Sequence, residues 1–454
     1  MIRKVLLLAV ITALAASFAR ADDLTDIRRA CFERGNFHTG IHWLEECVQE
    51  MFTAEPFHVT LTTVAPGAGI VAFGPAFGKS IPIGHSDFLL SSSAAVSTDG
   101  SYTGSAQIMF ALPTPGFFHL NEDSTRSARN KYGLHATEPR AGLDPLDAEM
   151  LVTAGYRRFD AREQDFYGLG PSTTLSGHAG YGLLLSDTYI KVDDPLSAWN
   201  SVGINLSFLQ PRVTTTINDT IPQIRAAYNG AAVPGLNSRD DFLCYEPYLL
   251  FRIPPHRSFF TTVRVGYSFY QALGDRSFSF QRFSATNSTS VPLWVPSHGT
   301  PRFRTNRFLN FICPSLRSAT RCSMGDLTLT GSVALAYKGA ESQVPFYFDQ
   351  TLGGTDISGN DTLRGFADYR FRGPSSVLFQ AEYRHGIWGP FGLLAFYDLG
   401  KVAILPSDVS LDHLRHDIGL GLFVRAGNHE VMRVYVGFGT GEPTRFAPKF
   451  PVSF

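Results

Sequence analysis

A single arginine stands in a stretch of turn-forming residues between two segments in which apolar and polar side chains alternate. The stretch runs from Gly353 to Arg372 and reads GGTDISGNDTLRGFADYRFR, with Arg364 followed at once by Gly365 and Phe366. A guanidinium carries five donors in a fixed fork, so its chemistry is the binding of carboxylates and not proton transfer. A long loop that holds such a cation needs a structural or functional reason.

Two carboxylates on the following segments are candidate partners for this arginine. Between Val377 and His385 the odd positions are apolar, which turns Glu382 to the opposite face; between Phe391 and Val402 the same pattern turns Asp398 to that face. Removing one partner from a desolvated cluster of this kind costs about 3 to 5 kcal/mol, whereas an ordinary solvated ion pair contributes about 1 kcal/mol or less. The residues leave both alternatives open, and in either case the cluster is structural and does no chemistry.

The residue types that catalysis needs are present, but they form no recognisable motif. A serine hydrolase requires Ser, His and an acid or amide that converge, and the 13 histidines are not accompanied by a nucleophile-elbow sequence. His385 and His413 lie near the ends of alternating segments, where interfacial residues are expected. No second cysteine pair or histidine pair stands at ligand spacing. We therefore expect no enzymatic activity, no metal and no cofactor.

The composition is poor in charge and rich in glycine and phenylalanine. Of 454 residues, 44% are hydrophobic and only 17% are charged, with 42 Gly and 37 Phe. Charge this low indicates a poorly hydrated surface. The formal net charge is -1, and without residues 1–21, which carry Arg3, Lys4 and Arg20 and no acid, the chain is mildly acidic. A mildly acidic chain argues against nucleic acid as a partner.

The N-terminal residues predict export. Residues 1–21 begin with Arg3 and Lys4, continue with an apolar run that is short for a spanning helix, and end in an A-x-A cleavage site. We interpret them as a signal peptide. Residues 22–57 show helical spacing and are too few for an independent core without a staple. A disulfide between Cys31 and Cys47 could provide one, although sequence alone does not fix the pairing.

From residue 58 to residue 454 the hydrophobic period is two. Each alternating segment has about ten residues, as a tilted membrane-spanning strand requires. A soluble β-sandwich also alternates, but here the polar face carries small residues and glycine, which suits a lumen better than a solvated sheet. After the signal no run of 18 apolar residues occurs. We therefore predict an all-β fold, a transmembrane antiparallel β-barrel of about sixteen strands.

Three polar connections are predicted to be exposed loops, namely Asn121 to Asp147, Thr214 to Asp241 and Arg282 to Met324. Cys313 and Cys322 are expected to form a disulfide within the third. Cys244 is left over on the inward face of a strand, where an inert thiol is expected. The stretch of residues 340–370 is predicted to be a loop that folds inward.

Several motifs near the C-terminus resemble those of one family of outer-membrane proteins. They are PFYFDQTLGG from Pro345, LRGF at Leu363–Phe366, AEYR at Ala381–Arg384, FYDLGKV at Phe396–Val402, GLGLFVR at Gly419–Arg425 and the terminal Phe454. Together they are similar to the barrel of the BamA/TamA family, the bacterial surface antigen superfamily, over roughly the last 130 residues. An earlier FYGLGPST, at Phe166–Thr173, also resembles that superfamily.

The resemblance implies roles for the residues already singled out. In the family the loop that carries this motif folds back into the barrel and its arginine binds acidic residues of the inner wall. That implies a pairing of Arg364 with Asp398 and Glu382. Members that insert or translocate proteins carry periplasmic POTRA domains, and the roughly 35 residues before the first expected strand are too few for one. We therefore expect a relative that consists of the barrel without POTRA domains.

The last predicted strand, Arg445 to Phe454, contains Pro448 and Pro451, which lack a ladder donor. Its pairing with the first strand is therefore expected to be weak. In the family a seam between first and last strands is proposed to open for client strands. The prolines are equally compatible with such a gate and with a frayed end.

These observations together predict a protein of the bacterial outer membrane. Its expected role is insertion or translocation of polypeptides or lipids, in contact with outer-membrane lipids and with a separate periplasmic partner. The alternative from another class is a passive diffusion channel, porin-like, with the inward loop as its plug. A third reading is a structural surface protein that partners recognise through its loops.

Overall fold

The computed structural model describes residues 56–62, 64–65, 71–83, 86–113, 149–197, 199–256, 259–294, 325–356, 359–388, 391–426 and 429–449. The predicted signal peptide lies outside these residues, and so does the predicted helical segment apart from Pro56 and Phe57 at its end. So do Pro451, Phe454 and four of the cysteines, Cys31, Cys47, Cys313 and Cys322. Cys244 is buried and carries a free thiol.

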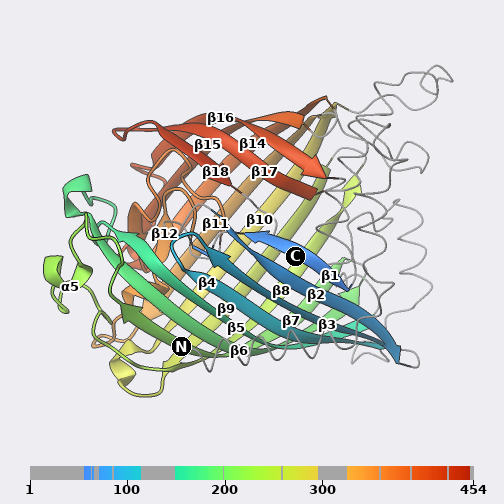
Figure 1. Cartoon of the computed structure of the whole chain (residues 1–454), viewed down its shortest axis with the longest axis horizontal. Helices are drawn as coiled ribbons and strands as arrows, with labels where there is room; N and C mark the ends of the chain where they lie inside the picture. The colour runs from blue at the N-terminus through green and yellow to red at the C-terminus, as the bar shows by residue number, and fades with distance from the viewer. Residues whose placement is uncertain are drawn as a thin grey trace.

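Sixteen strands of the described chain form one antiparallel sheet in which each strand pairs with its neighbour in sequence. They curl round an interior (Figure 1), and the chain is an all-β antiparallel barrel. In order the strands are β1 (Phe57–Thr62), β2 (Ala72–Ile83), β3 (Ser86–Ser97), β4 (Tyr102–Pro113), β5 (Glu149–Phe166), β6 (Ala179–Ser197), β7 (Asn200–Thr214), β8 (Phe242–His256), β9 (Phe259–Ala272), β10 (Phe280–Trp294), β11 (Gly325–Lys338), β14 (Ser375–Trp388), β15 (Phe391–Ala403), β16 (Arg415–Ala426), β17 (His429–Gly439) and β18 (Arg445–Lys449).

Short elements lie in the connections between these strands, among them the β7–β8 and the β11–β14 connections. The β7–β8 connection carries α5 (Ile224–Ala227). Between β11 and β14 lie a 3-10 turn, η7 (Phe346–Phe348), and a two-stranded ribbon of β12 (Gln350–Leu352) and β13 (Phe371–Gly373). Three-residue strands cannot hold a ribbon alone, so other contacts must fix this connection.

The distribution of polar and apolar side chains in the barrel is the inverse of that in a water-soluble protein. Along β7 and β8 the large apolar side chains point outward and are exposed, among them Ile204, Leu206, Leu243, Leu249 and Phe251. The inward positions of the strands carry polar and charged groups, some of them buried, such as Asp187 and Asp193 on β6. An apolar exterior around a polar interior is the arrangement that a lipid bilayer requires of strands. Among the described residues no helix has the length and apolarity to cross a membrane.

The structure corrects two of the sequence predictions. The loop predicted for Arg282 to Met324 begins too early, because β10 continues to Trp294 and pairs with β9 and β11 along its length. The serines and threonines of β10 that face the lumen resemble the composition of a loop, and for this reason the prediction was wrong here. The strands are also longer than the predicted ten residues, since β5 has 18 and β6 has 19.

Candidate functional site

One connection occupies the interior of the barrel. Residues 339–374, the plug segment, lie between β11 and β14 and contact inward side chains of strands around the wall. These contacts reach Tyr181 on β6, Arg282 on β10, Asp398 on β15 and Lys449 on β18. A segment that touches opposite sides of a barrel lies across its lumen. The predicted inward loop, residues 340–370, falls within it.

Arg364 fixes the middle of the plug segment to the wall, and we call this contact the lock. Its Nε and Nη2 donate to the two carboxylate oxygens of Asp398 at 2.8 and 2.7 Å, and its backbone N–H donates to Asp398 Oδ2 at 3.2 Å. Its Nη1 donates to Glu382. The guanidinium carbon lies 3.9 Å from the centroid of the Phe396 ring. The two acids named from the resemblance are thus the ones that the arginine contacts.

The lock is removed from water. Arg364 is 2% exposed and Asp398 is 0% exposed. Burial by itself would lower the pKa of Arg364, but the hydrogen bonds and charge of Asp398, together with the charge of Glu382, raise it further above its usual value. The guanidinium therefore stays charged at any physiological pH. A buried charge held this way is costly to leave unpaired, which favours the desolvated alternative over a solvated pair.

Gly365 and Phe366 complete the contact between the plug segment and the wall. A Cβ on Gly365 would lie 2.6 Å from the Asp417 Cβ and 2.7 Å from the Gly439 backbone nitrogen, so only glycine allows this approach. Phe366 is fully buried in an apolar cluster formed by the plug and by β14 and β15. The other members of that cluster are Leu352, Leu363, Phe371, Leu378 and Val402.

The charges around the lock extend into a network that sequence analysis did not anticipate. Asp417 on β16 is the register partner of Asp398 and is 1% exposed, so a third carboxylate faces the plug. Glu382 also binds Arg384, and Arg384 Nη1 lies 3.2 Å from Glu430 Oε2. The alternation of apolar and polar residues was sufficient to predict that these side chains face inward. Which charges they pair with depends on the path of the plug segment.

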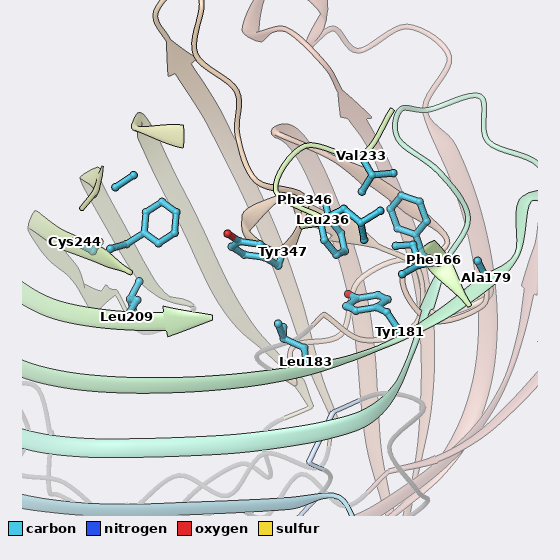
Figure 2. Close-up of a cluster of buried hydrophobic side chains, with 13 residues drawn as sticks. Phe166, Ala179, Tyr181, Leu183, Leu209, Val233, Leu236, Cys244, Phe346 and Tyr347 are labelled. Atoms are coloured by element: carbon cyan, nitrogen blue, oxygen red, sulfur yellow. The ribbon is translucent and has the colours of Figure 1, made fainter. Parts of the chain in front are cut away.

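On the other side of the barrel the plug segment is anchored by aromatic side chains. Phe346 is fully buried between Phe166 and Tyr181, with ring centroids 5.6 and 5.1 Å away in edge-on orientations (Figure 2). Arg372 donates to the Tyr181 hydroxyl at 2.8 Å and to the Phe346 carbonyl at 2.9 Å. These contacts hold the beginning and the end of the plug against β5 and β6.

The β5–β6 connection, which carries the FYGLGPST motif, also binds the plug segment. The backbone N–H of Gly170 donates to the Arg372 carbonyl at 2.7 Å. Arg370 donates to the hydroxyl and the carbonyl oxygen of Thr173, both at 2.8 Å. The FYGLGPST motif therefore contacts the end of the plug segment, although Thr173 and Arg370 are 197 residues apart in the sequence.

Two further residues singled out in the sequence, Pro448 and His385, lie in strands of the sheet. Pro448 lies in β18 opposite Val434. His385 lies on β14 opposite Gly325 of β11, and its Nδ1 lies 3.0 Å from the Tyr383 hydroxyl. In the part of the chain that the structure describes, no group of three or more His, Cys, Asp or Glu side chains could hold a metal ion.

Fold and site together define a class, namely an antiparallel membrane barrel whose lumen holds a locked internal segment. No family model matches the sequence, and no curated protein matches it either. Among solved structures the chain is similar to BamA from Haemophilus ducreyi lacking POTRA domains 1-3, with 12% identity and a TM-score of 0.49 over 87% of this chain and 69% of that one.

Two further solved barrels are also similar. CdiB from Acinetobacter baumannii shows 13% identity and a TM-score of 0.47, and CdiB from Escherichia coli shows 11% and 0.47, each over 87% of this chain. This chain spans 60% and 61% of those two chains. At sequence identities this low, the similarity is one of fold and not of function.

Proposed function

We propose that this chain is an outer-membrane barrel of the BamA/TamA type that inserts or translocates polypeptides or lipids, with its lumen closed at rest by the plug segment. One observation supports this above all: the plug is held by a buried ion lock on one side and by an aromatic anchor on the other. A passive pore has no need of such a fixed obstruction. A barrel that moves clients needs a closed resting state, because an open lumen would leak small solutes.

The test is reconstitution of the full chain into lipid vesicles with an unfolded outer-membrane strand protein as client. We expect faster folding of the client than in empty vesicles, and only rare, small conductance events in the same preparation. A steady, wide, salt-dependent current with no effect on the client would overturn the proposal in favour of a diffusion channel.

The proposal includes a separate periplasmic partner that delivers clients. It predicts that client folding rises further when a periplasmic extract is enclosed with the barrel. An identical rate with and without the extract would remove the partner from the account without affecting the barrel's own activity.

A further inference from the structure

The backbone ladder that the structure describes between β17 and β18 is short. Within the described residues β18 covers Arg445–Lys449 and pairs with β17 at five positions. One of these is Pro448, which has no N–H to donate to the ladder. By comparison, β16 and β17 pair at ten positions. In the part of β18 that the structure describes, contacts outside the ladder also hold the strand.

The plug segment supplies such contacts at both ends of the strand. Arg445, the first residue of β18, donates to the Phe366 carbonyl at 2.6 Å and to Asp368 Oδ2 at 2.7 Å. Lys449, the last residue, binds Asp361. Positions 445 and 449 lie on the same face of the strand, so the plug holds β18 from inside the barrel.

The plug segment packs tightly against Arg445. Gly354 of the plug has φ +59, and a Cβ there would lie 1.8 Å from Arg445 Nη1. The Arg445 and Asp368 side chains are 17% and 20% exposed. The turn that precedes β18 is held too, because Arg370 of the plug binds Glu442 at 2.7 Å.

At the other end of β18 two cations face each other beside the plug segment. Arg433 on β17 and Lys449 on β18 are register partners, so two cations stand directly opposite each other. Like charges in this position destabilise strand pairing. Asp361 of the plug lies between them, 2.6 Å from Arg433 Nη1 and bound to Lys449. Among the described residues, Lys449 pairs with Asp361 and is near the charge of Asp356, and both acids belong to the plug. Arg433 also binds Glu430 and lies 3.8 Å from Glu382.

From this geometry we propose that the plug segment is an electrostatic latch on the last strand. With the plug in the lumen, Asp361 and Asp368 neutralise the cations of β18. When the plug moves, Arg433 and Lys449 repel each other across the β17–β18 ladder. Movement of the plug and loosening of β18 are then one coupled event. This inference rests on the proposed function, for which it names the regulation: the lumen and the last strand open together or not at all.

The experiment is backbone hydrogen exchange, followed by mass spectrometry, on the full chain in lipid vesicles. Asp361→Asn is expected to speed exchange in residues 445–449 about tenfold, because the repulsion is no longer neutralised. Adding Lys449→Gln to that variant removes the repulsion and should return exchange to within about twofold of the parent. Asp349→Asn is the matched control, since Asp349 is a plug acid whose cationic neighbours are Arg372, Arg282 and Lys338.

Several outcomes would overturn the latch. Unchanged exchange in Asp361→Asn, or effects of Asp361→Asn and Lys449→Gln that merely add, would mean that no repulsion is held in check. If Asp361→Asn alone fails to fold, folding of the double variant supports the latch, and failure of both contradicts it. Client folding is measured separately. If the variants change hydrogen exchange as expected but the barrel does not fold clients, the proposed function is wrong and the latch stands. If the barrel folds clients but the variants do not change exchange as expected, the latch is wrong and the proposed function stands.

Discussion

At the scale of residues, Arg364 and Asp398 form the most completely buried charge pair of the plug segment. Because Asp398 accepts three hydrogen bonds from Arg364, Asp398→Asn should lower the free energy of unfolding by about 3 to 5 kcal/mol. The measurement is the temperature at which heat-modifiable gel migration is lost. Asp187→Asn is the control, because Asp187 is a buried lumen acid whose partner, Arg157, is 61% exposed. Equal losses in the two variants would contradict a special role for the lock.

A second residue of the plug carries a prediction about pH. Asp349 is 8% exposed and, among the described residues, neither of its carboxylate oxygens accepts a hydrogen bond. Burial raises its pKa to about 8, against the opposing charges of Arg372, Arg282 and Lys338. The folded chain therefore holds this proton more tightly than the unfolded chain does. Stability is greatest when Asp349 is protonated, and it falls as the pH rises from the ordinary carboxyl range through about 8.

Asp349→Asn should remove this dependence, since the amide is neutral at every pH. The variant is expected to be more heat-resistant than the parent at pH 9, by at most a few kcal/mol, and close to it at pH 4. Melting followed across that pH range checks the expectation. A difference in stability between the variant and the parent that does not grow as the pH rises would show that Arg282 and Arg372 outweigh burial at this site.

At the scale of elements, the plug and β17 approach each other through glycine. A Cβ on Gly437 would lie 2.8 Å from the Gly365 Cα, whereas a Cβ on Gly331 of β11 would make an ordinary contact of 3.5 Å with Phe379. Gly437→Ala should therefore cost about 1 to 3 kcal/mol by overpacking and displace the plug. Gly331→Ala is the matched control and should change little. Protease cleavage within the plug reports the displacement, and equal cleavage of both variants would refute it.

The elements also show where sequence reasoning succeeds and where it stops. The alternation of apolar and polar residues in β14 and β15 was sufficient to predict that Glu382 and Asp398 face inward. A strand in lipid must separate its apolar face from its polar face. The prediction from alternation failed at β10, where Ser284, Ser288 and Ser290 suit a lumen wall and a loop equally well. The contacts of Asp361 with β17 and β18 could not be predicted, since they depend on the path of a segment some 70 to 90 residues away in sequence.

At the scale of the whole molecule, the inverted distribution of polarity makes the barrel depend on lipid. Leu206 on β7 is 42% exposed and faces outward, while its neighbour Asn205 faces inward. Leu206→Arg should destabilise the folded barrel by about 2 to 4 kcal/mol if the site lies near the bilayer midplane. Asn205→Arg, on the same strand, should be tolerated in the polar lumen. Folding yield into vesicles separates the two variants, and the opposite order would invert the assignment of faces.

Whether the lock closes the lumen can be measured as conductance. The measurement compares the conductance of the parent barrel with that of Arg364→Ala in planar bilayers, alongside Arg157→Ala, which removes an exposed lumen arginine outside the lock. We expect the parent and Arg157→Ala to open rarely, and Arg364→Ala to conduct for most of the recording, provided that gel migration shows a folded barrel. A parent that conducts steadily, or an Arg364→Ala barrel that folds and stays as closed as the parent, would contradict the account.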